Sequence, residues 1–566
     1  MMRRTLSLWL ALALGAASAC GSSDGGSPAA GTGPGDADAA GGGGGGGSTD
    51  GGPAGGDGGG TTVPVATTTC TLEALVDVTG AATAANEAEL RAALAAGGKV
   101  KMTADITATA PLPVTLPTVL DGGGFTLSGG GTTHLVTARM TDLVVQNITM
   151  RDAKNTVPAT EHFSRQSGAA IMVSGGNGTS DGPATGSLKV IKATFIGNRA
   201  EAVSNGDVRG GAVYLFNLPN ASFSEVTFDG NAAVSGGAIG GLGSSFTVAG
   251  STFRNNEGNA SGRGGNLDGA GGAISLDALS QNKQTAYFKV CGSAFENNRA
   301  VRVGGAIYYV NHWKTGSVVE IRQSAFVGNR TTSTTEGQGG AIFAMDDDKY
   351  PQNAGAANAT SITESLFSKN ATWGQGGGVW FWTKEGSLLV RNTTFHENTT
   401  DPAHATGMGG GLAVSSGTNV TVMSSTFARN YAKFHGGGIQ MGGAPGVTVS
   451  MGNTLFYDNR SERDGGYANF HTNRAVDTDL GGNMQYLAPA LVIDVNSDKP
   501  VSANVTVADA ALAPLADNGG PTQTMAIASG SPAHNAGAVI ADAPKVDQRL
   551  KDRDGQPDVG AFEVTP

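Results

Sequence analysis

A repeat is the feature of this sequence that most constrains its fold. Phenylalanine followed three residues later by asparagine recurs nine times in the middle of the chain. The nine pairs are Phe195-Asn198, Phe228-Asn231, Phe253-Asn256, Phe295-Asn298, Phe326-Asn329, Phe367-Asn370, Phe395-Asn398, Phe427-Asn430 and Phe456-Asn459. Between successive pairs stands a second signature, two glycines followed by a small and an aliphatic residue, as in Gly304-Gly305-Ala306-Ile307. Such self-similarity is the signature of a solenoid.

The residues between the signatures indicate short strands. Val420 and Val422 stand two residues apart ahead of Phe427, which is the period of a strand. Glycine pairs cost about 1 kcal/mol per residue inside a helix, so a helical solenoid is excluded. Several short strands joined by bends make up about one coil of a parallel β-helix. We therefore predict an all-β fold, a right-handed parallel β-helix.

Each signature has an expected role in such a coil. The phenylalanines point inward and stack from coil to coil, about 4.8 Å apart. The asparagines adopt the left-handed bend conformation and bond to one another in a ladder. The glycine pair allows positive φ and close backbone approach at a second corner. The gaps between the pairs vary in length, and we expect the extra residues to form loops at the corners, where solenoids place function.

A helix is predicted ahead of the repeat. Asn86 to Ala96 has an apolar face, an N-cap at Asn86, a Glu three residues later and a Gly-Gly stop. Such a helix would cover the open edge of the first coil. The predicted divisions are a cap with the first coils over 63–165, the repeat β-helix over 166–470 and a C-terminal region over 471–566.

Residues 1–19 predict an export signal. Arg3 and Arg4 precede an apolar run, and Ala17-Ser18-Ala19 offers small residues for cleavage. Cys20 follows at once, as in a bacterial lipobox, in which the cysteine is lipidated and becomes the mature N-terminus. Ordinary signal peptidase cleavage is the alternative. We expect an acylated Cys20.

Residues 20–62 are rich in glycine, with an unbroken run from Gly41 to Gly47. Such a segment cannot bury a core, so we predict a disordered tether that would hold the folded body clear of a membrane. The lipid is then the only expected membrane contact.

The other two cysteines are Cys70 and Cys291. We expect them to lie several coils apart, beyond the Cα separation of about 7 Å that a disulfide permits. Both are therefore predicted to be unpaired.

Two families share these motifs. Over residues 165–470 the repeats resemble those of chlamydial polymorphic membrane proteins, which implies a surface-displayed β-helix that acts as an adhesin. The tail resembles the end of choice-of-anchor family Q proteins, which implies an exported β-helix held at the surface. The matching tail segments are 514–522, 530–533 and 558–563.

An enzyme of this fold would need paired carboxylates or Asp-bound Ca²⁺ beside a basic residue. The best acidic cluster is Asp346-Asp347-Asp348, a weak candidate Ca²⁺ site, and a solvated acidic loop is the favoured interpretation. Asp552-x-Asp554-Gly555 is similarly interpreted as a turn. His312, His396 and His435 are expected in loops or turns. No complete catalytic constellation is found, so we assign no catalytic residue and expect no cofactor.

One group of side chains suggests binding. Alignment of the coils on the glycine pairs places alternate residues of three strands outward, in two neighbouring columns. The ligand-binding candidates from these columns and their borders are Tyr308, Trp313, Phe343, Trp380, Trp382 and Lys384. We expect the columns to be exposed and truncation of Trp380 to leave folding intact. Cover by a loop, which would make a satellite core, is the alternative.

The sequence thus favours a monomeric lipoprotein of the outer membrane or cell surface, or a secreted protein, that binds a glycan or a surface protein. A polysaccharide lyase or glycoside hydrolase is the first alternative, and a structural envelope component is the second. The formal net charge is −11 and no basic stripe is present, which argues against nucleic acid as a partner.

Overall fold

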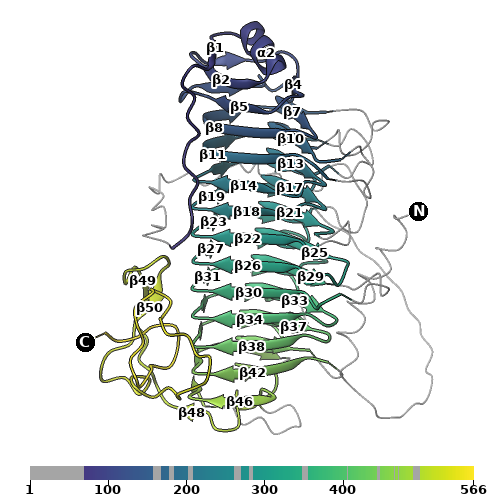
Figure 1. Cartoon of the computed structure of the whole chain (residues 1–566). Coiled ribbons are helices and arrows are strands. Elements are labelled where there is room, and N and C mark those ends of the chain that lie inside the picture. Colours follow the sequence, from purple (N-terminus) through teal and green to yellow (C-terminus); the bar gives the residue numbers. More distant parts are fainter. Residues whose placement is uncertain are drawn as a thin grey trace, which may run out of the picture. The chain divides into compact units, whose positions relative to one another are not determined.

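The computed structural model shows a parallel β-helix, which confirms the predicted fold class (Figure 1). The signal sequence, the tether and Cys20 lie outside the described residues. The described residues are 69–156, 167–176, 184–201, 208–259, 269–279, 285–346, 355–403, 406–442, 446–463, 466–468, 471–488 and 498–565.

One coil of the helix contains four short strands. A representative coil runs through β26 (Val318–Arg322), β27 (Ala325–Val327), β28 (Arg330–Thr331) and β29 (Ile342–Asp346). Strands equivalent to β26 and to β27 form two parallel ladders of one 26-stranded sheet, called sheet A here. Strands equivalent to β29 form an 11-stranded sheet, called sheet B, and those equivalent to β28 form sheet C.

Sheet B is parallel throughout. Its strands are β4 (Leu112–Val114), β7 (Val136–Arg139), β10 (Ile171–Ser174), β13 (Val213–Phe216), β17 (Ile239–Leu242), β21 (Ile274–Asp277), β25 (Ile307–Asn311), β29, β33 (Val379–Thr383), β37 (Leu412–Ser415) and β41 (Ile439–Met441).

The nine phenylalanines of the repeat form one continuous stack inside the coils. Neighbouring ring centroids lie between 4.6 and 5.1 Å apart, and the ring planes are nearly parallel. This spacing equals the distance between hydrogen-bonded strands, so each ring contacts the next without distorting the sheet. Each buried ring contributes roughly 1.5–3 kcal/mol.

The asparagines form the expected ladder. Asn298 Nδ2 donates to Asn329 Oδ1 at 2.9 Å and to the Phe253 carbonyl at 2.9 Å, and the Asn298 backbone N–H donates to the same Asn329 oxygen at 3.0 Å. The same side-chain bond recurs from Asn198 to Asn459. These bonds satisfy the buried amides, which would otherwise cost stability.

The left-handed conformation was expected at the ladder asparagines, and that prediction is wrong. The positive φ belongs to the residue directly before each of them, for example Gly328 (67°), Asn297 (53°) and Lys369 (57°). The ladder asparagine must direct its side chain inward to reach the next coil, so the residue outside the corner makes the bend. The bend is therefore not what selects Asn for the ladder.

The glycine pair acts as predicted. Its first member has positive φ in every coil of the repeat, as at Gly304 (63°). A Cβ on its second member would meet the backbone of the next coil, as at Gly305, where it would lie 2.0 Å from the Gly340 oxygen. One glycine makes the turn and the other allows the coils to approach.

The N-terminal cap is also confirmed. Helix α2 (Glu87–Ala96) begins at its N-cap Asn86, whose side chain accepts the Glu89 N–H at 3.0 Å. The Ala85 N–H in turn donates to the Glu89 carboxylate at 2.8 Å, in a variant of the capping box that engages the residue before the N-cap. Leu90 and Leu94 are buried on the main core, and Gly97 ends the helix with φ 72°.

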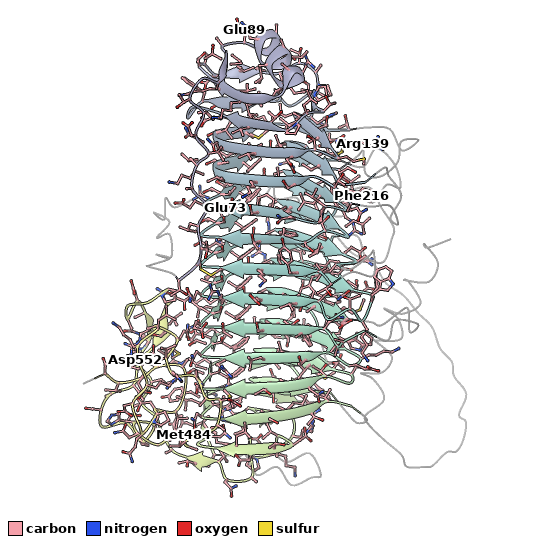
Figure 2. The ribbon with its side chains drawn as sticks, viewed as in Figure 1. Glu73, Glu89, Arg139, Phe216, Met484 and Asp552 are labelled. Atoms are coloured by element: carbon pink, nitrogen blue, oxygen red, sulfur yellow. A yellow bond between two sulfur atoms is a disulfide. The ribbon has the colours of Figure 1, made fainter. Side chains whose placement is uncertain are left out.

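The chain ahead of this cap runs along the outside of the coils as a strap, residues 69–78 (Figure 2). Thr69 exchanges two hydrogen bonds with the side chain of Gln323, and Val76 does the same with Gln146. Between them Glu73 pairs with Lys189 at 2.8 Å. The strap thus crosses many coils within ten residues.

This path joins the two cysteines that were predicted to be unpaired. Cys70 and Cys291 form a disulfide, with their Cα atoms 5.8 Å apart. The prediction was wrong because it placed Cys70 at the beginning of the first coil. The strap instead carries Cys70 back to the coil of β22 (Tyr287–Cys291).

After β48 (Thr506–Val507), which still pairs with sheet A, the C-terminal segment, residues 509–565, folds back on the outside of that sheet (Figure 1). Thr394 Oγ1 donates to Gln548 Oε1 at 2.6 Å, and Asn392 Nδ2 donates to the Val546 carbonyl at 2.8 Å. Arg553 pairs with Glu563 at 2.8 Å, and both side chains are almost fully buried. The segment contains β49 (Leu515–Ala516) and β50 (Thr524–Met525), and the Asp554 carboxylate accepts the Gln556 N–H, in agreement with the predicted turn.

His471 ends the asparagine ladder. Asn459 Nδ2 lies 3.3 Å from His471 Nδ1, where the next asparagine would stand, and His471 Nε2 lies 3.3 Å from the Leu487 carbonyl. Burial lowers the pKa of His471 to about 4, and the bond to Leu487 opposes this shift. The contacts fit a neutral ring that donates from Nε2 and accepts at Nδ1.

We expect His471 to make stability depend on pH. The pKa is near 6.5 in the unfolded chain, so the folded state binds this proton more weakly. The stabilisation is complete above pH 6.5 and is lost as the pH falls from 6.5 to 4, by roughly 3 kcal/mol. Urea unfolding of wild type and His471→Asn from pH 7.5 to 4 measures this as a difference. If the free energy of unfolding changed equally with pH in the two proteins, His471 would contribute nothing to the pH dependence of stability.

The disulfide should limit how far the chain extends under force. It closes a loop with a sequence separation of 221 residues. In single-molecule pulling on the two ends of the full chain, this loop stays closed until the bond is reduced. Reduction should then add on the order of 750 Å of contour length, at about 3.4 Å per residue. Cys70→Ser should show the longer contour without reductant, and equal contours in wild type and variant would contradict the bond.

Candidate functional site

The connections between strands single out one face of the coil. Between β14 (Ala221–Ser224) and β43 (Leu455–Tyr457), two connections have the same length in every coil. One joins the two ladders of sheet A, and the other leads from sheet A into sheet C. The connections into and out of sheet B vary, from Asp346–Ala359 in one coil to Thr383–Ser387 in the next. Sheet B is therefore bordered by all the variable segments of this region, which is where solenoids place binding surfaces.

The predicted columns do lie on the outward face of sheet B. Tyr308, Phe343 and Trp380 stack at 5.4 and 4.5 Å between ring centroids. Their inward neighbours Ile307 and Phe381 belong to the main core, whereas the three rings form a separate cluster. The predicted register is therefore correct.

The predicted exposure of these columns is wrong. Tyr308, Phe343 and Trp380 are 2%, 0% and 2% exposed. Trp313 is also buried, Trp382 is half-buried at the edge of the cluster, and Lys384 is exposed.

The residues ahead of each glycine pair explain this burial. Gln375 accepts a hydrogen bond from Trp380 Nε1 at 3.2 Å. Ala270 and Val303, which precede the glycine pairs of earlier coils, belong to the same cluster as the rings. The turn at the first glycine is tight enough to fold these residues over the outward side chains. The face is a satellite core, the alternative that sequence reasoning had left open.

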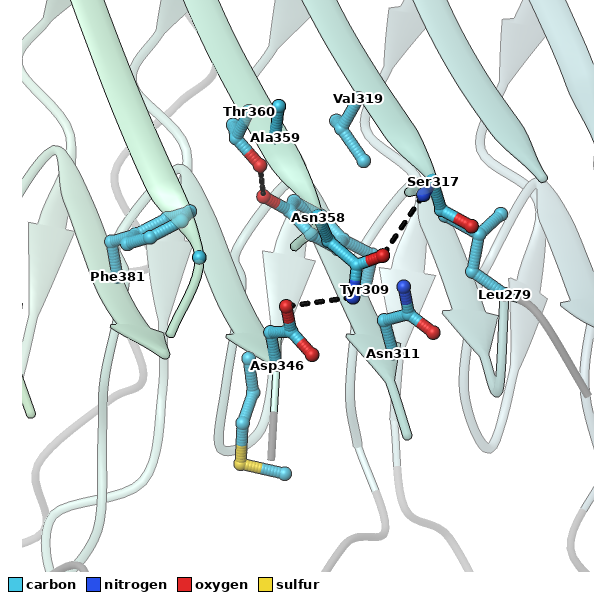
Figure 3. Close-up of a pocket in the computed structure, with 12 residues that line it drawn as sticks. Leu279, Tyr309, Asn311, Ser317, Val319, Asp346, Asn358, Ala359, Thr360 and Phe381 are labelled. Atoms are coloured by element: carbon cyan, nitrogen blue, oxygen red, sulfur yellow. Dashed lines mark hydrogen bonds between the residues drawn. The ribbon is translucent and has the colours of Figure 1, made fainter. Parts of the chain in front are cut away.

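The acidic loop begins at a small cavity of about 20 Å³, which has the volume of one water molecule (Figure 3). Asp346 accepts a hydrogen bond from Asn358 Nδ2 at 2.8 Å, and Asn358 Oδ1 accepts the Ser317 N–H at 2.9 Å. On the opposite wall Tyr309 Oη lies 2.8 Å from Thr360 Oγ1, and burial raises the pKa of Tyr309. These bonds fix the connection between sheets B and A.

Asp347 and Asp348 lie outside the described residues, so neither the favoured solvated acidic loop nor the weaker Ca²⁺ site is tested. Among the described residues, no group of three His, Cys, Asp or Glu side chains could hold a metal ion. His396 was expected in a loop or turn, but it ends strand β35 (Thr394–His396), where its Nδ1 lies 3.2 Å from Ser368 Oγ. His396 pairs with Ser368 of the preceding coil because the parallel strand pairing of sheet A continues through this position.

A buried charged cluster on sheet B was not predicted. Arg209 donates to Asp277 Oδ2 at 2.9 Å, and His312 Nε2 lies 3.5 Å from Asp277 Oδ1. All three side chains are largely buried. Burial alone would raise the pKa of Asp277, but the charge of Arg209 and the contact with His312 hold it well below its usual range.

Glycine makes this cluster possible. Arg209 precedes β13, whereas Asp277 ends β21 two coils later, and the coil between them contributes Gly240. A Cβ on Gly240 would lie 2.6 Å from the Arg209 Cβ, so a larger residue would block the arginine. The Gly240-Gly241 pair inside a strand was the one sequence signal for this contact.

The described chain contains no helix with the length and apolarity needed to cross a bilayer. No protein-family model and no curated protein matches the sequence significantly. The candidate site therefore stands on its own geometry, as the outward face of sheet B with its satellite core, its buried charges and its variable borders.

We expect Trp380→Ala to destabilise the fold. The ring is buried between Phe343 and Gln375, so its removal leaves a cavity that costs roughly 3–5 kcal/mol, as for the inward Phe381→Ala. Lys384→Ala, at an exposed position, should change the free energy of unfolding by less than about 0.5 kcal/mol. Denaturant unfolding compares the three variants. A Trp380→Ala protein as stable as Lys384→Ala would refute the satellite core.

Proposed function

We propose that this chain is an exported, surface-retained β-helix lipoprotein that binds a glycan or protein partner through sheet B and the connections around it. The main support for this proposal is that connection lengths vary beside sheet B and are constant at the other corners of the coil. Between β14 and β43 the connections within sheet A and into sheet C have one constant length, whereas those beside sheet B vary from coil to coil. Variable loops on a rigid scaffold are where binding residues concentrate.

Two further features support it. The Cys70–Cys291 disulfide suits an oxidising compartment outside the cytoplasm. At the edge of the satellite core, half-buried Trp382 stands beside exposed Lys384, and an ion pair joins Lys314 to Glu385. An aromatic edge next to charged groups can contact a sugar ring or a partner side chain.

The burial of the aromatic columns favours a second candidate, a structural envelope component. Tyr308, Phe343 and Trp380 stabilise sheet B and offer a ligand almost no surface. A lyase or hydrolase has less support. The two carboxylates in the described strands of sheet B are Asp277, which pairs with Arg209, and Asp346, which bonds to Asn358. Both are engaged by neighbouring groups, whereas glycoside hydrolysis needs two available carboxylates.

Binding by the full mature chain to a glycan array and to immobilised extracellular matrix proteins tests the proposal. We expect Trp382→Ala and Lys384→Ala to weaken the strongest interaction by roughly 1–3 kcal/mol if they act as hot spots. Tyr287→Ala and Lys289→Ala form a matched control, an aromatic residue and a lysine two positions apart on the outward face of sheet A. These changes should leave affinity within about twofold.

Equal loss of affinity in both pairs would place the contact surface elsewhere. Absence of binding to every glycan and matrix protein would favour the structural role. Release of reducing ends or unsaturated sugars from an arrayed polysaccharide would support the lyase or hydrolase alternative.

A further inference from the structure

A groove of about 380 Å³ lies between the C-terminal segment and the coils of sheet A. Ser424 and Asn453 line it from the coils, and residues between Ala538 and Pro557 line it from the segment. Its volume is within the range of small-ligand sites. It belongs to neither sheet B nor the satellite core, so the proposed function leaves it unexplained.

The walls of the groove are fixed by hydrogen bonds. Asn453 donates from Nδ2 to the Ala538 carbonyl at 2.9 Å and accepts the Ala538 N–H at 2.7 Å. On the other side the Arg553 N–H donates to the Lys545 carbonyl at 2.8 Å, and the Arg553 side chain is held by Glu563. The shape of the groove is therefore set before any ligand arrives, which lowers the entropy cost of binding.

The chemistry of the groove is mixed. Lys545, Asp552 and Asp554 are exposed along it, and Figure 2 shows Asp552 on the C-terminal segment. None of the three forms an ion pair with another described residue, and Asp554 alone accepts a backbone bond, from Gln556. Val539 is 86% exposed at the same groove, beside Ile540. Apolar side chains, two acceptors and one donor thus converge on one space.

This combination selects among ligands. Two carboxylates repel an anionic ligand, and Lys545 repels a cationic one. Hydroxyl groups suit both, because each hydroxyl can donate to a carboxylate and accept from an ammonium. A ring with one C–H face would also cover Val539 and Ile540, which would otherwise meet water.

We propose that this groove binds a neutral saccharide, one or two sugar units long, between Lys545, Asp552 and Val539. The site is independent of the sheet B surface, so it can fail or hold without affecting the proposed function. It would give the C-terminal segment a recognition role in addition to its packing on sheet A.

The test uses the full mature chain and an array of neutral glycans, followed by titration calorimetry with the strongest ligand. Val539→Trp fills the groove at an exposed position and should weaken binding at least tenfold without loss of folding. Asp552→Asn should weaken it severalfold. Asp517→Asn, the same substitution at an exposed site outside the groove, should bind as wild type does.

Other results would overturn the proposal. One is the absence of binding to any neutral glycan on the array, and another is wild-type affinity in Val539→Trp. A third is a loss of affinity in Asp517→Asn equal to that in Asp552→Asn. Binding of a cationic peptide that Asp552→Asn abolishes, without saccharide binding, would also overturn it. If Trp382→Ala removes glycan binding and Val539→Trp does not, sheet B is the glycan site and the groove proposal fails. The opposite result supports the groove as the glycan site and leaves protein binding by sheet B untouched.

Discussion

The asparagine ladder is the interaction on which the rest of this structure depends. Each ladder amide bonds to the amide of the next coil and to the carbonyl of a phenylalanine in an earlier one, as Asn298 does with Asn329 and Phe253. An amide that slipped by one residue would be buried without a partner. The ladder therefore fixes register, and register places the phenylalanines in one stack and every outward residue in a column.

Fixed register also explains how two distant segments lie along one corner of the coil. The strap bonds to Gln146 and Gln323, and the C-terminal segment continues along the corner to Asn392 and Asn453. All four side chains lie at the corner between the two ladders of sheet A, and the repeat places Gln323, Asn392 and Asn453 at equivalent positions. Two non-repeating segments can then bind a regular row of polar groups, and one of them is held covalently by Cys70.

The features that the repeat determines could be predicted from the sequence. The solenoid, the capping helix, the roles of the glycine pair and the inward register all follow from local spacing and propensity. Sequence reasoning failed where the contact depends on the path of a non-repeating segment, as for Cys70, or on a contact across two coils, as for Arg209 and Asp277. Neither the path of the strap nor the contact across two coils recurs with a period that the sequence could show. The bend before each ladder asparagine was missed because Gly, Asn and even Lys369 occupy that position.

The burial of Trp380 has a more general cause. In a flat sheet, the outward side of a strand faces solvent, and alternation then separates core from surface. Here the turn at each glycine pair folds the preceding residue, such as Gln375 or Val303, over the outward side chains. The same turn that closes the core thus creates a second one on sheet B. Residues that repeat in every coil are consequently used for packing. Recognition is left to the places where the chain departs from its repeat, which are the variable connections beside sheet B and the C-terminal segment with its groove.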